Sequence, residues 1–250
     1  MFKDQMKRGG LIGTFVMVPS PDLVSIAGIA GFDFVIVDLE HGALSFSDVC
    51  PLVNAALASG VRPIIRVPEL NSAMIGKALD SGADAIIVPG VEKREHAAAA
   101  VAAAKFAPLG ARGACPRVRG SAYGVRPRGE FYSRDNDERA IITLVESRKG
   151  IGNVRQIVGV EGLDALFLGY SDLSHSLGHV NDPGHPVVRA CLDGAIREAK
   201  AANVLLGVSC LSEAEAQDRL RSGVSFVTFS GIETLALNGC RDAVRRLRGG

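Results

Sequence analysis

Short apolar runs alternate with longer amphipathic stretches along almost the whole chain. Eight of the runs have the length and the aliphatic, β-branched composition of strands buried on both faces. They lie at residues 11–16, 34–41, 61–66, 85–89, 141–146, 165–169, 204–209 and 225–229. Eight buried strands that alternate with helices over about 250 residues are typical of a parallel (β/α)8 barrel. We therefore predict an α/β fold of the TIM-barrel type, with an open doubly wound sheet as the alternative.

Helical patterns fill most of the intervals between these strands. We expect helices at residues 21–30, 47–60, 71–82, 93–105, from about 151, 186–201, 212–222 and 232–248. Pro21 suits a first helical turn, and Asn71 suits an N-cap. Only residues 106–139, rich in Arg and Gly, interrupt the alternation. No linker divides the chain, so we predict one domain over residues 1–250, with an inserted segment at about 106–139 and a terminal helix at about 232–248.

Composition and charge narrow the possible partners. Apolar residues make up 47% of the chain, charged residues 22%, and the formal net charge is +1. This balance gives no general electrostatic reason to expect nucleic acid or a membrane surface as a partner. The five cysteines are odd in number and form no CxxC pair, which indicates reduced thiols. No run approaches the roughly 18 apolar residues of a membrane span, so we expect a cytoplasmic protein.

Ionisable side chains gather where the predicted strands end. The run FVIVDLEH carries no charge until its last four residues and then supplies two acids and an imidazole. In a parallel barrel the carboxyl ends of all strands meet at one rim, where ligands bind. The groups that four strands would bring there are Asp38, Glu40, His41, Arg66, Glu146 and Asp172.

These residue types suit chemistry on a 2-oxo acid. Glu146 and Asp172 offer hard oxygen ligands for Mg²⁺ or Mn²⁺. Arg66 has a fork of donors for a carboxylate or a developing enolate. His41 can act as a base near neutral pH, held in one tautomer if Asp38 accepts its other N–H. A cation and an arginine around a 2-oxo acid would stabilise a pyruvate enolate.

Several motifs in combination resemble a known family. They are VDLEHG, IIRVP, ALDSGADAIIVP, GARG at 110–113, LVES and LFLGYSDLSHSLG, and they occur in order over nearly the whole chain. The chain is similar to the HpcH/HpaI aldolase/citrate lyase family, especially its 4-hydroxy-2-oxoheptanedioate and 2-dehydro-3-deoxyglucarate aldolases. The resemblance implies a barrel of the phosphoenolpyruvate/pyruvate type and a reversible cleavage of a 4-hydroxy-2-oxo acid to pyruvate and an aldehyde. It also implies a divalent metal (Mg²⁺, Mn²⁺ or Co²⁺), no organic cofactor, and a homohexamer that exchanges the terminal helix.

The resemblance further implies roles for single residues. His41 would be the general base, assisted by Asp38, and Arg66 would bind the carboxyl and carbonyl groups of pyruvate. Glu146 and Asp172 would hold the metal. The remaining residues it implies are Asp80, in the proton network of the histidine across a subunit contact, and Gly169, Tyr170 and Ser171, lining the pyruvate site.

Two positions depart from the family pattern. Leu144 stands where a glutamine is usual, two residues before the metal glutamate, and Tyr170 stands where a proline is usual. Loss of an amide donor would weaken pyruvate binding or change the preferred donor, and Tyr170 would move the loop that presents Asp172. These departures keep one alternative open, a catalytically altered barrel that binds pyruvate or oxalate. An acyl-CoA lyase of the citryl- or malyl-CoA type is a further alternative within the superfamily, although the EH motif after the second strand disfavours it.

Other motifs have competing interpretations. Asp172, His175, His179 and His185 lie within fourteen positions and suggest a zinc site, although Gly178 and Pro183 disfavour a regular helix there. Residues 112–128 contain five arginines but only one aromatic residue, so we expect a segment over the barrel mouth or at a subunit contact instead of a nucleic-acid patch. Gly150 and Gly152 lack the third glycine of a dinucleotide motif.

Overall fold

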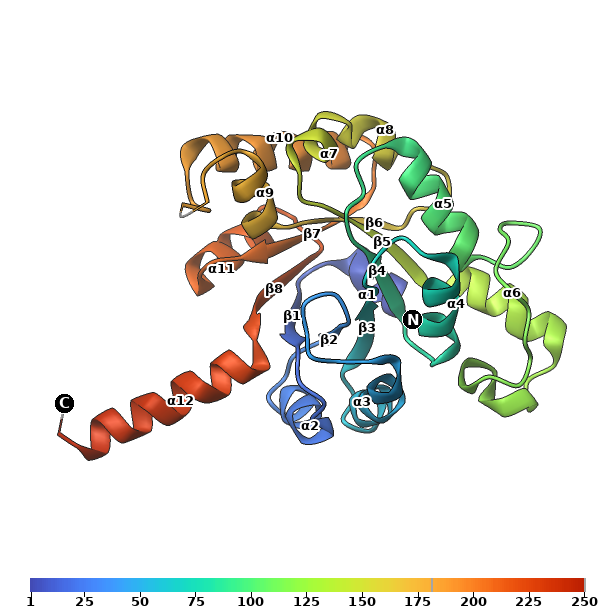
Figure 1. Ribbon diagram of the computed structural model, residues 1–250, viewed down its shortest axis with the longest axis horizontal. Coiled ribbons are helices and arrows are strands. Elements are labelled where there is room, and N and C mark those ends of the chain that lie inside the picture. Colours follow the sequence, from blue (N-terminus) through green and yellow to red (C-terminus); the bar gives the residue numbers. More distant parts are fainter. Residues whose placement is uncertain (181, 250) are drawn as a thin grey trace.

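Eight parallel strands close into a barrel in chain order, as the computed structural model of residues 1–180 and 182–249 shows (Figure 1). The strands are β1 (Leu11–Val16), β2 (Phe34–Asp38), β3 (Arg62–Arg66), β4 (Ala85–Val88), β5 (Ala140–Val145), β6 (Ala165–Leu168), β7 (Leu205–Cys210) and β8 (Phe226–Gly231). The pairing of β1 with β8 closes the barrel. The (β/α)8 prediction is confirmed and the open sheet is wrong. Residues 181 and 250, within the predicted domain range, lie outside the described residues.

Helices cover the outside of the barrel, most of them where the periodicity predicts. They are α2 (Pro21–Ile29), α3 (Phe46–Ala58), α4 (Ser72–Asp80), α5 (Arg94–Ala104), α7 (Arg148–Gly152), α8 (Val154–Val158), α10 (Pro186–Ala201) and α11 (Glu213–Arg221). The predicted terminal helix is α12 (Ile232–Leu247), which extends away from the barrel. Side-chain caps define several starts: Ser20 accepts from Leu23 N, Asn71 from Ala73 N, and Ser212 from Glu215 N.

Four elements were not predicted from the periodicity. They are α1 (Phe2–Arg8), the 3-10 helix η1 (Arg119–Gly124), α6 (Arg128–Glu138) and α9 (Tyr170–Ser176). The helix α9 stands where we expected a loop after β6, which corrects that expectation. It ends at Ser176, before Gly178, which adopts a positive φ of 84°. Asp172 and His175 therefore lie on one short helix directly after β6.

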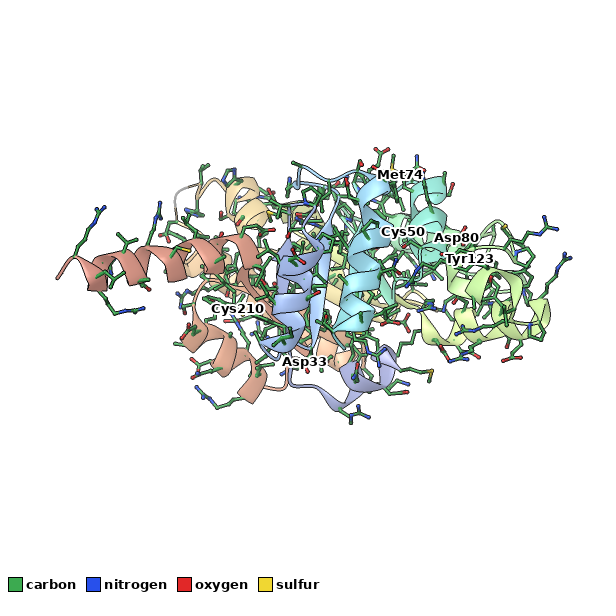
Figure 2. All side chains as sticks on the ribbon, turned by 90° about the horizontal axis from the view of Figure 1, so that it is seen from below. Asp33, Cys50, Met74, Asp80, Tyr123 and Cys210 are labelled. Carbon is green, nitrogen blue, oxygen red and sulfur yellow. The ribbon has the colours of Figure 1, made fainter. Side chains whose placement is uncertain are left out.

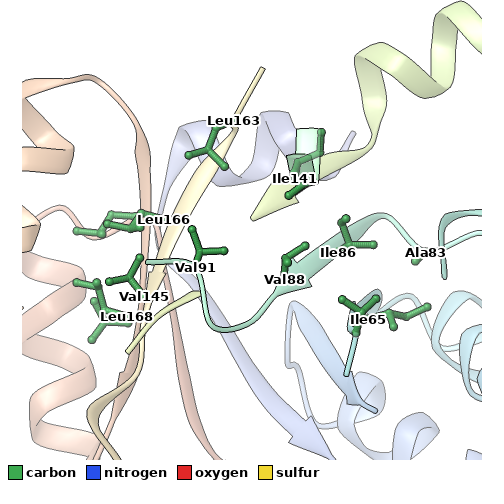
Figure 3. Packing of buried hydrophobic residues seen from close by; sticks show 14 of the residues in the cluster. Ile65, Ala83, Ile86, Val88, Val91, Ile141, Val145, Leu163, Leu166 and Leu168 are labelled. Carbon is green, nitrogen blue, oxygen red and sulfur yellow. The ribbon is translucent and has the colours of Figure 1, made fainter. Parts of the chain in front are cut away.

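Two hydrophobic clusters hold these layers together. The larger lies between the strands and the helices, and Figure 3 shows Ile65, Ile86, Val145 and Leu166 from it, among others. The smaller fills the inside of the barrel with aromatic rings from three strands, Phe34, Phe167 and Phe226. A strand buried on both faces needs apolar residues throughout, which explains the continuous apolar runs in the sequence.

Glycines on two strands make room for the rings inside the barrel. A Cβ atom added at Gly13 would lie 2.1 Å from the Phe34 ring, and one added at Gly207 would lie 2.0 Å from the Phe226 ring. The rings of Phe34 and Phe226 meet edge to face, with centroids 5.7 Å apart. A larger residue at either glycine would force the facing ring or its strand to shift.

The short helix α1 closes the end of the barrel where the strands begin. Phe2 and Met6 are buried, and the Phe2 ring packs against Phe34 at 5.9 Å. Lys3 on the same helix forms an ion pair of 3.0 Å with Asp164, just before β6. This end is therefore closed by apolar contacts and matched charges, which leaves the opposite rim as the open one.

Two parts of the chain extend away from the barrel in opposite directions (Figures 1 and 2). One is residues 106–139, with η1 and α6, and the other is α12. Ile232 is the buried residue of α12, while Leu237, Val244 and Leu247 are exposed. Within residues 1–180 and 182–249, no helix combines the length and apolar character needed to cross a membrane.

Candidate active site

A pocket of about 350 Å³ opens at the rim formed by the carboxyl ends of the strands. Its lining combines an apolar wall with ionisable groups. The lining residues are Phe15, Met17, His41, Arg66, Leu144, Glu146, Phe167, Gly169, Tyr170, Ser171, Asp172, His175 and Ser209. The pocket thus brings together His41, Arg66, Glu146, Gly169, Tyr170, Ser171 and Asp172 from the predicted site. Asp38 lies beneath it, and Asp80 does not line it.

Asp38 and Arg66 form a buried pair under the pocket. They are register partners on β2 and β3, and their residues are 0% and 6% exposed. Arg66 donates from Nε to Oδ1 of Asp38 at 2.9 Å and from Nη2 to Oδ2 at 2.5 Å. A bidentate pair of this kind fixes the plane of the guanidinium. The two hydrogen bonds to Asp38 and the burial of the pair therefore hold Arg66 in one orientation.

The turn after β2 is organised by the same carboxylate. Oδ1 of Asp38 also accepts from the main-chain N–H groups of Glu40, at 3.0 Å, and His41, at 3.2 Å. This geometry corrects our expectation about the His41 ring: within the described residues, no hydrogen bond joins that ring to Asp38. The imidazole is 55% exposed, and its Nε2 lies 3.9 Å from Oε2 of Glu40. Asp38 orients His41 through the backbone instead.

Glu40 does not line the pocket but lies beside Arg66, which does. Its Oε2 lies 3.0 Å from Nη1 of Arg66, but the atoms are not aligned for a hydrogen bond. In the described part of the chain this buried oxygen has no hydrogen-bond partner. Burial raises the pKa of Glu40 above its ordinary value, although Arg66 opposes the rise. An underpartnered buried carboxylate beside the pocket favours a bound cation or donor there.

Glu146 follows β5 and is a second strongly perturbed acid. Burial raises its pKa to about 7; the Gly90 N–H, which donates to Oε1 at 3.1 Å, lowers the pKa, while Glu40 and Asp172 raise it. Gly169 leaves space beside it, because a Cβ atom at that position would lie 3.4 Å from Oε2 of Glu146. Like charges crowded at a buried site favour protonation or a cation.

These acids fit a divalent cation that keeps much of its own hydration. No group of three His, Cys, Asp or Glu residues in the described ranges forms a complete metal cage. Mg²⁺ is commonly held by one or two carboxylates, with water and substrate oxygens completing the shell. Glu146 and Asp172 match that pattern, since both line the pocket and the charge of Asp172 raises the pKa of Glu146.

A polar network binds the hydroxyl group of Tyr170 to α11. The residue is 2% exposed, its OH donates to Oε1 of Glu215, and Nη2 of Arg219 donates to its OH at 2.8 Å. Burial raises the pKa of Tyr170 to about 12. Its hydroxyl is therefore committed to α11, and Tyr170 lines the pocket together with the apolar Leu144. Nothing in the local sequence pairs Tyr170 with residues 45 or more positions later.

Asp80 lies apart from His41 within the chain. Its Oδ1 accepts from Nη2 of Arg112 at 2.7 Å, and Nη1 of Arg112 binds Asp135 at 2.8 Å. Figure 2 shows Asp80 on the side of the barrel that carries residues 106–139. Arg112 is thus a buried structural residue, and none of the residues that line the pocket belongs to the Arg-rich segment.

The histidines after Asp172 do not form the zinc site that their spacing suggested. The rings of His179 and His185 stack with centroids 3.6 Å apart, and Nδ1 of His185 accepts from Val187 N. No three-residue metal cluster occurs among the described residues, which include all of these side chains. His175 instead lines the pocket, one turn after Asp172.

Comparisons with known proteins agree with this architecture. The sequence profile of the HpcH/HpaI aldolase/citrate lyase family matches residues 11–237. A 2-dehydro-3,6-dideoxy-6-sulfogluconate aldolase from Pseudomonas putida is 33% identical, over 97% of this chain and 94% of its own. A 5-keto-4-deoxy-D-glucarate aldolase from Salmonella paratyphi A is 34% identical, over 86% of this chain and 84% of its own. A crystal structure of a family protein from Burkholderia cenocepacia aligns with a TM-score of 0.94 at 30% identity, covering 99% of both chains.

Proposed function

Because the chain belongs to the HpcH/HpaI aldolase/citrate lyase family, we propose that it is a divalent-metal-dependent class II aldolase. The reaction is the reversible cleavage of a 4-hydroxy-2-oxo acid to pyruvate and an aldehyde. The observation that carries the proposal is the group of crowded acids beside one fixed guanidinium: Glu40, Glu146 and Asp172 around Arg66. The two named relatives are aldolases of sugar-derived acids, which supports a substrate of that class.

The carboxylate end of the substrate would bind beside Arg66, next to a metal held by the acids. Glu146 and Asp172 would hold the metal, which supplies positive charge to stabilise a developing enolate. Arg66 uses two of its five N–H donors on Asp38. Its remaining donors on Nη1 and Nη2 are available to the C1 carboxylate and the C2 oxygen. Because its plane is fixed by Asp38, Arg66 needs no reorganisation when charge develops on that oxygen.

His41 is the base of the proposed reaction. Its ring is exposed at the rim, so a water can connect it to the C4 hydroxyl group of the substrate. Removal of the hydroxyl proton forms the aldehyde as the C3–C4 bond breaks, and the bonding electrons move to the C2 oxygen as an enolate. Protonation at C3 then yields pyruvate. Asp38 contributes by holding the main chain of His41 in place.

The apolar wall of Leu144 and Tyr170 shapes the donor side of the pocket. Gly169, Tyr170 and Ser171 provide main chain next to Glu146, and the ring of Tyr170 adds no hydrogen-bond donor, because its OH is already bound to α11. We propose that this wall packs against the methyl or methylene group at C3. Arg66 then carries the polar recognition that a glutamine at position 144 would otherwise share, and Glu146 and Asp172 would hold a metal that adds positive charge.

Assembly as a homohexamer is part of this proposal. The helix α12 extends from the barrel with Leu237, Val244 and Leu247 exposed, an arrangement that suits packing against a second copy of the chain (Figure 1). Asp80 lies on the opposite projecting side, where a neighbouring copy could bring it to a His41. Size-exclusion chromatography with light scattering tests the assembly directly, and a monomer at micromolar concentration would contradict it.

The decisive experiment measures pyruvate release from 4-hydroxy-2-oxoheptanedioate, 2-dehydro-3-deoxyglucarate and 5-keto-4-deoxy-D-glucarate. Each is assayed with Mg²⁺, Mn²⁺, Co²⁺ or EDTA, for the wild type and for His41→Ala and Glu146→Ala. Glu161→Ala and His96→Ala, outside the pocket, are the matched controls. We expect release that needs metal, disappears in Glu146→Ala and falls sharply in His41→Ala, with both controls active.

Other outcomes separate the alternatives. No release with any metal from a folded protein that still binds oxalate would indicate a catalytically altered barrel, the alternative raised by Leu144. Cleavage of citryl- or malyl-CoA in the same assay would indicate the acyl-CoA lyase instead.

A further inference from the structure

Glu233, in the first turn of α12, binds the chain where β1 ends. Its Oε1 accepts hydrogen bonds from the main-chain N–H groups of Met17, at 2.6 Å, and Val18, at 3.2 Å. Met17 lines the pocket, so α12 is hydrogen-bonded directly to the rim of the candidate active site. Nothing in the sequence pattern or the family resemblance assigned this residue a role.

The other side of Met17 holds the loop that carries His41. The carbonyl oxygen of Met17 accepts from Ala43 N at 3.2 Å. Gly42 packs closely against the same residue, since a Cβ atom there would lie 3.1 Å from Cα of Met17 and 2.4 Å from the carbonyl oxygen of Asp38. Met17 is therefore enclosed between Glu233 and the residues that directly follow His41.

We propose that Glu233 is a positioning residue for His41 and acts through a relay of main-chain contacts. The relay runs from Glu233 to Met17 and from Met17 to Gly42 and Ala43. This inference rests on the proposed function, in which His41 is the base. The exposed imidazole has no hydrogen bond to Asp38 in the described residues, so its location depends on the backbone of this loop.

A carboxylate suits this position for a physical reason. The N–H groups of Met17 and Val18 lie just beyond β1, where strand pairing no longer satisfies them, and an unmatched partly buried N–H is unfavourable. One charged oxygen satisfies both, and hydrogen bonds to a charged acceptor are stronger than neutral ones. Glu233 thus stabilises a bend in the chain that would otherwise have two open donors.

The backbone conformation at the junction of β8 and α12 places Glu233 next to that bend. Ser230 adopts a positive φ of 59°, which is uncommon for a residue with a side chain, and its carbonyl oxygen accepts from Oγ1 of Thr14 at 3.1 Å. Gly231 follows, and a Cβ atom there would lie 2.9 Å from Oε2 of Glu233. The backbone strain and the glycine both serve to bring α12 back onto β1.

The relay also links the site to a helix that extends beyond the barrel. Only the start of α12 is packed on the body, through Ile232 and the partly buried Leu235. A change in the tilt of α12 would displace Glu233 and with it Met17. The position of His41 is thereby coupled to the position of α12.

Kinetics of Glu233→Ala test the relay, with Glu233→Gln as the conservative variant. Glu213→Ala is the matched control, because Glu213 lies in the first turn of α11 and outside the pocket. We expect Glu233→Ala to lower kcat by roughly ten- to a hundredfold, as a displaced base does, with KM nearly unchanged. Glu233→Gln keeps an oxygen acceptor and is expected to restore most of kcat. Equal kcat for the wild type and Glu233→Ala would overturn the proposal.

A second arm reaches the same loop without touching α12. Gly42→Ala introduces the Cβ atom that collides with Asp38 and presses on Met17. It is expected to lower kcat in the same way, and the double variant Glu233→Ala/Gly42→Ala should lose less than the product of the two single effects, because both act on one segment. Fully multiplicative losses would show that the two residues act independently.

Hydrogen exchange measured by mass spectrometry provides a readout that needs no activity. In Glu233→Ala we expect faster exchange both in residues 15–18 and in residues 40–44, with other segments unchanged. Faster exchange in residues 15–18 alone would disprove transmission to the His41 loop. If the wild type releases no pyruvate, the proposed function fails, and this measurement still decides whether the relay exists.

Discussion

The two ends of the barrel use their polar groups in opposite ways. Where the strands begin, α1 places Phe2 and Met6 over the barrel interior, and Lys3 is matched by Asp164 at 3.0 Å. Where the strands end, burial raises the pKa values of Glu40 and Glu146, and the buried Oε2 of Glu40 has no hydrogen-bond partner among the described residues.

The contrast indicates what each end is for. Matched charges and packed rings lower the free energy of the folded chain at one end. Crowded carboxylates raise it at the other, because like charges repel and burial disfavours the ionised form of an acid. A bound cation would stabilise such a rim. Variants at the two ends should therefore separate activity from stability.

The largest expected effect comes from Glu146 at the open end. Glu146→Gln removes a ligand charge while keeping the size of the side chain, and we expect kcat to fall by roughly a thousandfold, since a metal contributes several kcal/mol to such reactions. Removing the metal with EDTA should have the same effect on the wild type. The free energy of unfolding without metal should rise or stay equal, because a crowded charge is lost. A less stable variant would contradict this view of the rim.

The closed end should respond in the opposite sense. Phe226→Ala removes a ring that packs against Phe34 and Phe167 inside the barrel, and we expect a loss of about 3–5 kcal/mol in the free energy of unfolding. Denaturant titration measures this loss. The fraction that remains folded should keep its metal affinity, as isothermal titration calorimetry can check; a parallel loss of metal binding would mean that the two ends are not separable.

A pH effect of intermediate size follows from the raised pKa of Glu146, which moves from 4.5 to about 7. Between these values the folded chain holds the proton more tightly than the unfolded chain, so stability without metal falls as pH rises from about 4.5 to 7. Each unit of raised pKa corresponds to about 1.4 kcal/mol. Metal affinity changes in the opposite direction and weakens as pH falls below about 7.

Denaturant titrations of the wild type and Glu146→Gln, both in EDTA across this pH range, isolate the effect in their difference. A difference that is constant with pH would show that Glu146 titrates at its ordinary pKa.

The smallest expected effect on stability and binding comes from Leu144, which lies between the barrel interior and the pocket. Leu144 belongs to the cluster inside the barrel and also lines the pocket. Leu144→Gln should cost about 1–3 kcal/mol of stability, as burial of an amide does, and should tighten oxalate binding a fewfold through a new donor. Leu144→Met is the apolar control and should change neither property much. Weaker oxalate binding in Leu144→Gln would show that the apolar wall itself recognises the donor.

Much of the barrel was predictable because its strands are buried on both faces. Continuous apolar runs and a helix between each pair are enough to fix the order of β1 to β8, and the carboxyl rim follows from the parallel arrangement. The helix α1 was missed, since its amphipathic pattern over Phe2–Arg8 is too short to distinguish from a polar terminus. Likewise α6 lies within a polar segment whose few apolar residues give weak periodicity.

The sequence predicted which residues gather at the site better than it predicted the hydrogen bonds between them. Adjacent strands in register bring Asp38 to Arg66, and this pairing is decided by the barrel and not by the local spacing of Asp38 and His41. Tyr170 binds α11, and Glu233 binds Met17 from a position 216 residues away. Sequence patterns report which face a residue occupies, but they carry no signal for partners so distant along the chain.

The closure of the barrel has a consequence for how the protein is made. β1 leaves the ribosome well before its closing partner β8, because six strands lie between them in the chain. Until then β1 presents an unpaired edge, to which another nascent chain can add. Packing of the aromatic interior is delayed in the same way, because Phe34 on β2 and Phe226 on β8 meet only after β8 has been synthesised. The edge of β1 therefore stays open to such pairing until β8 has been synthesised.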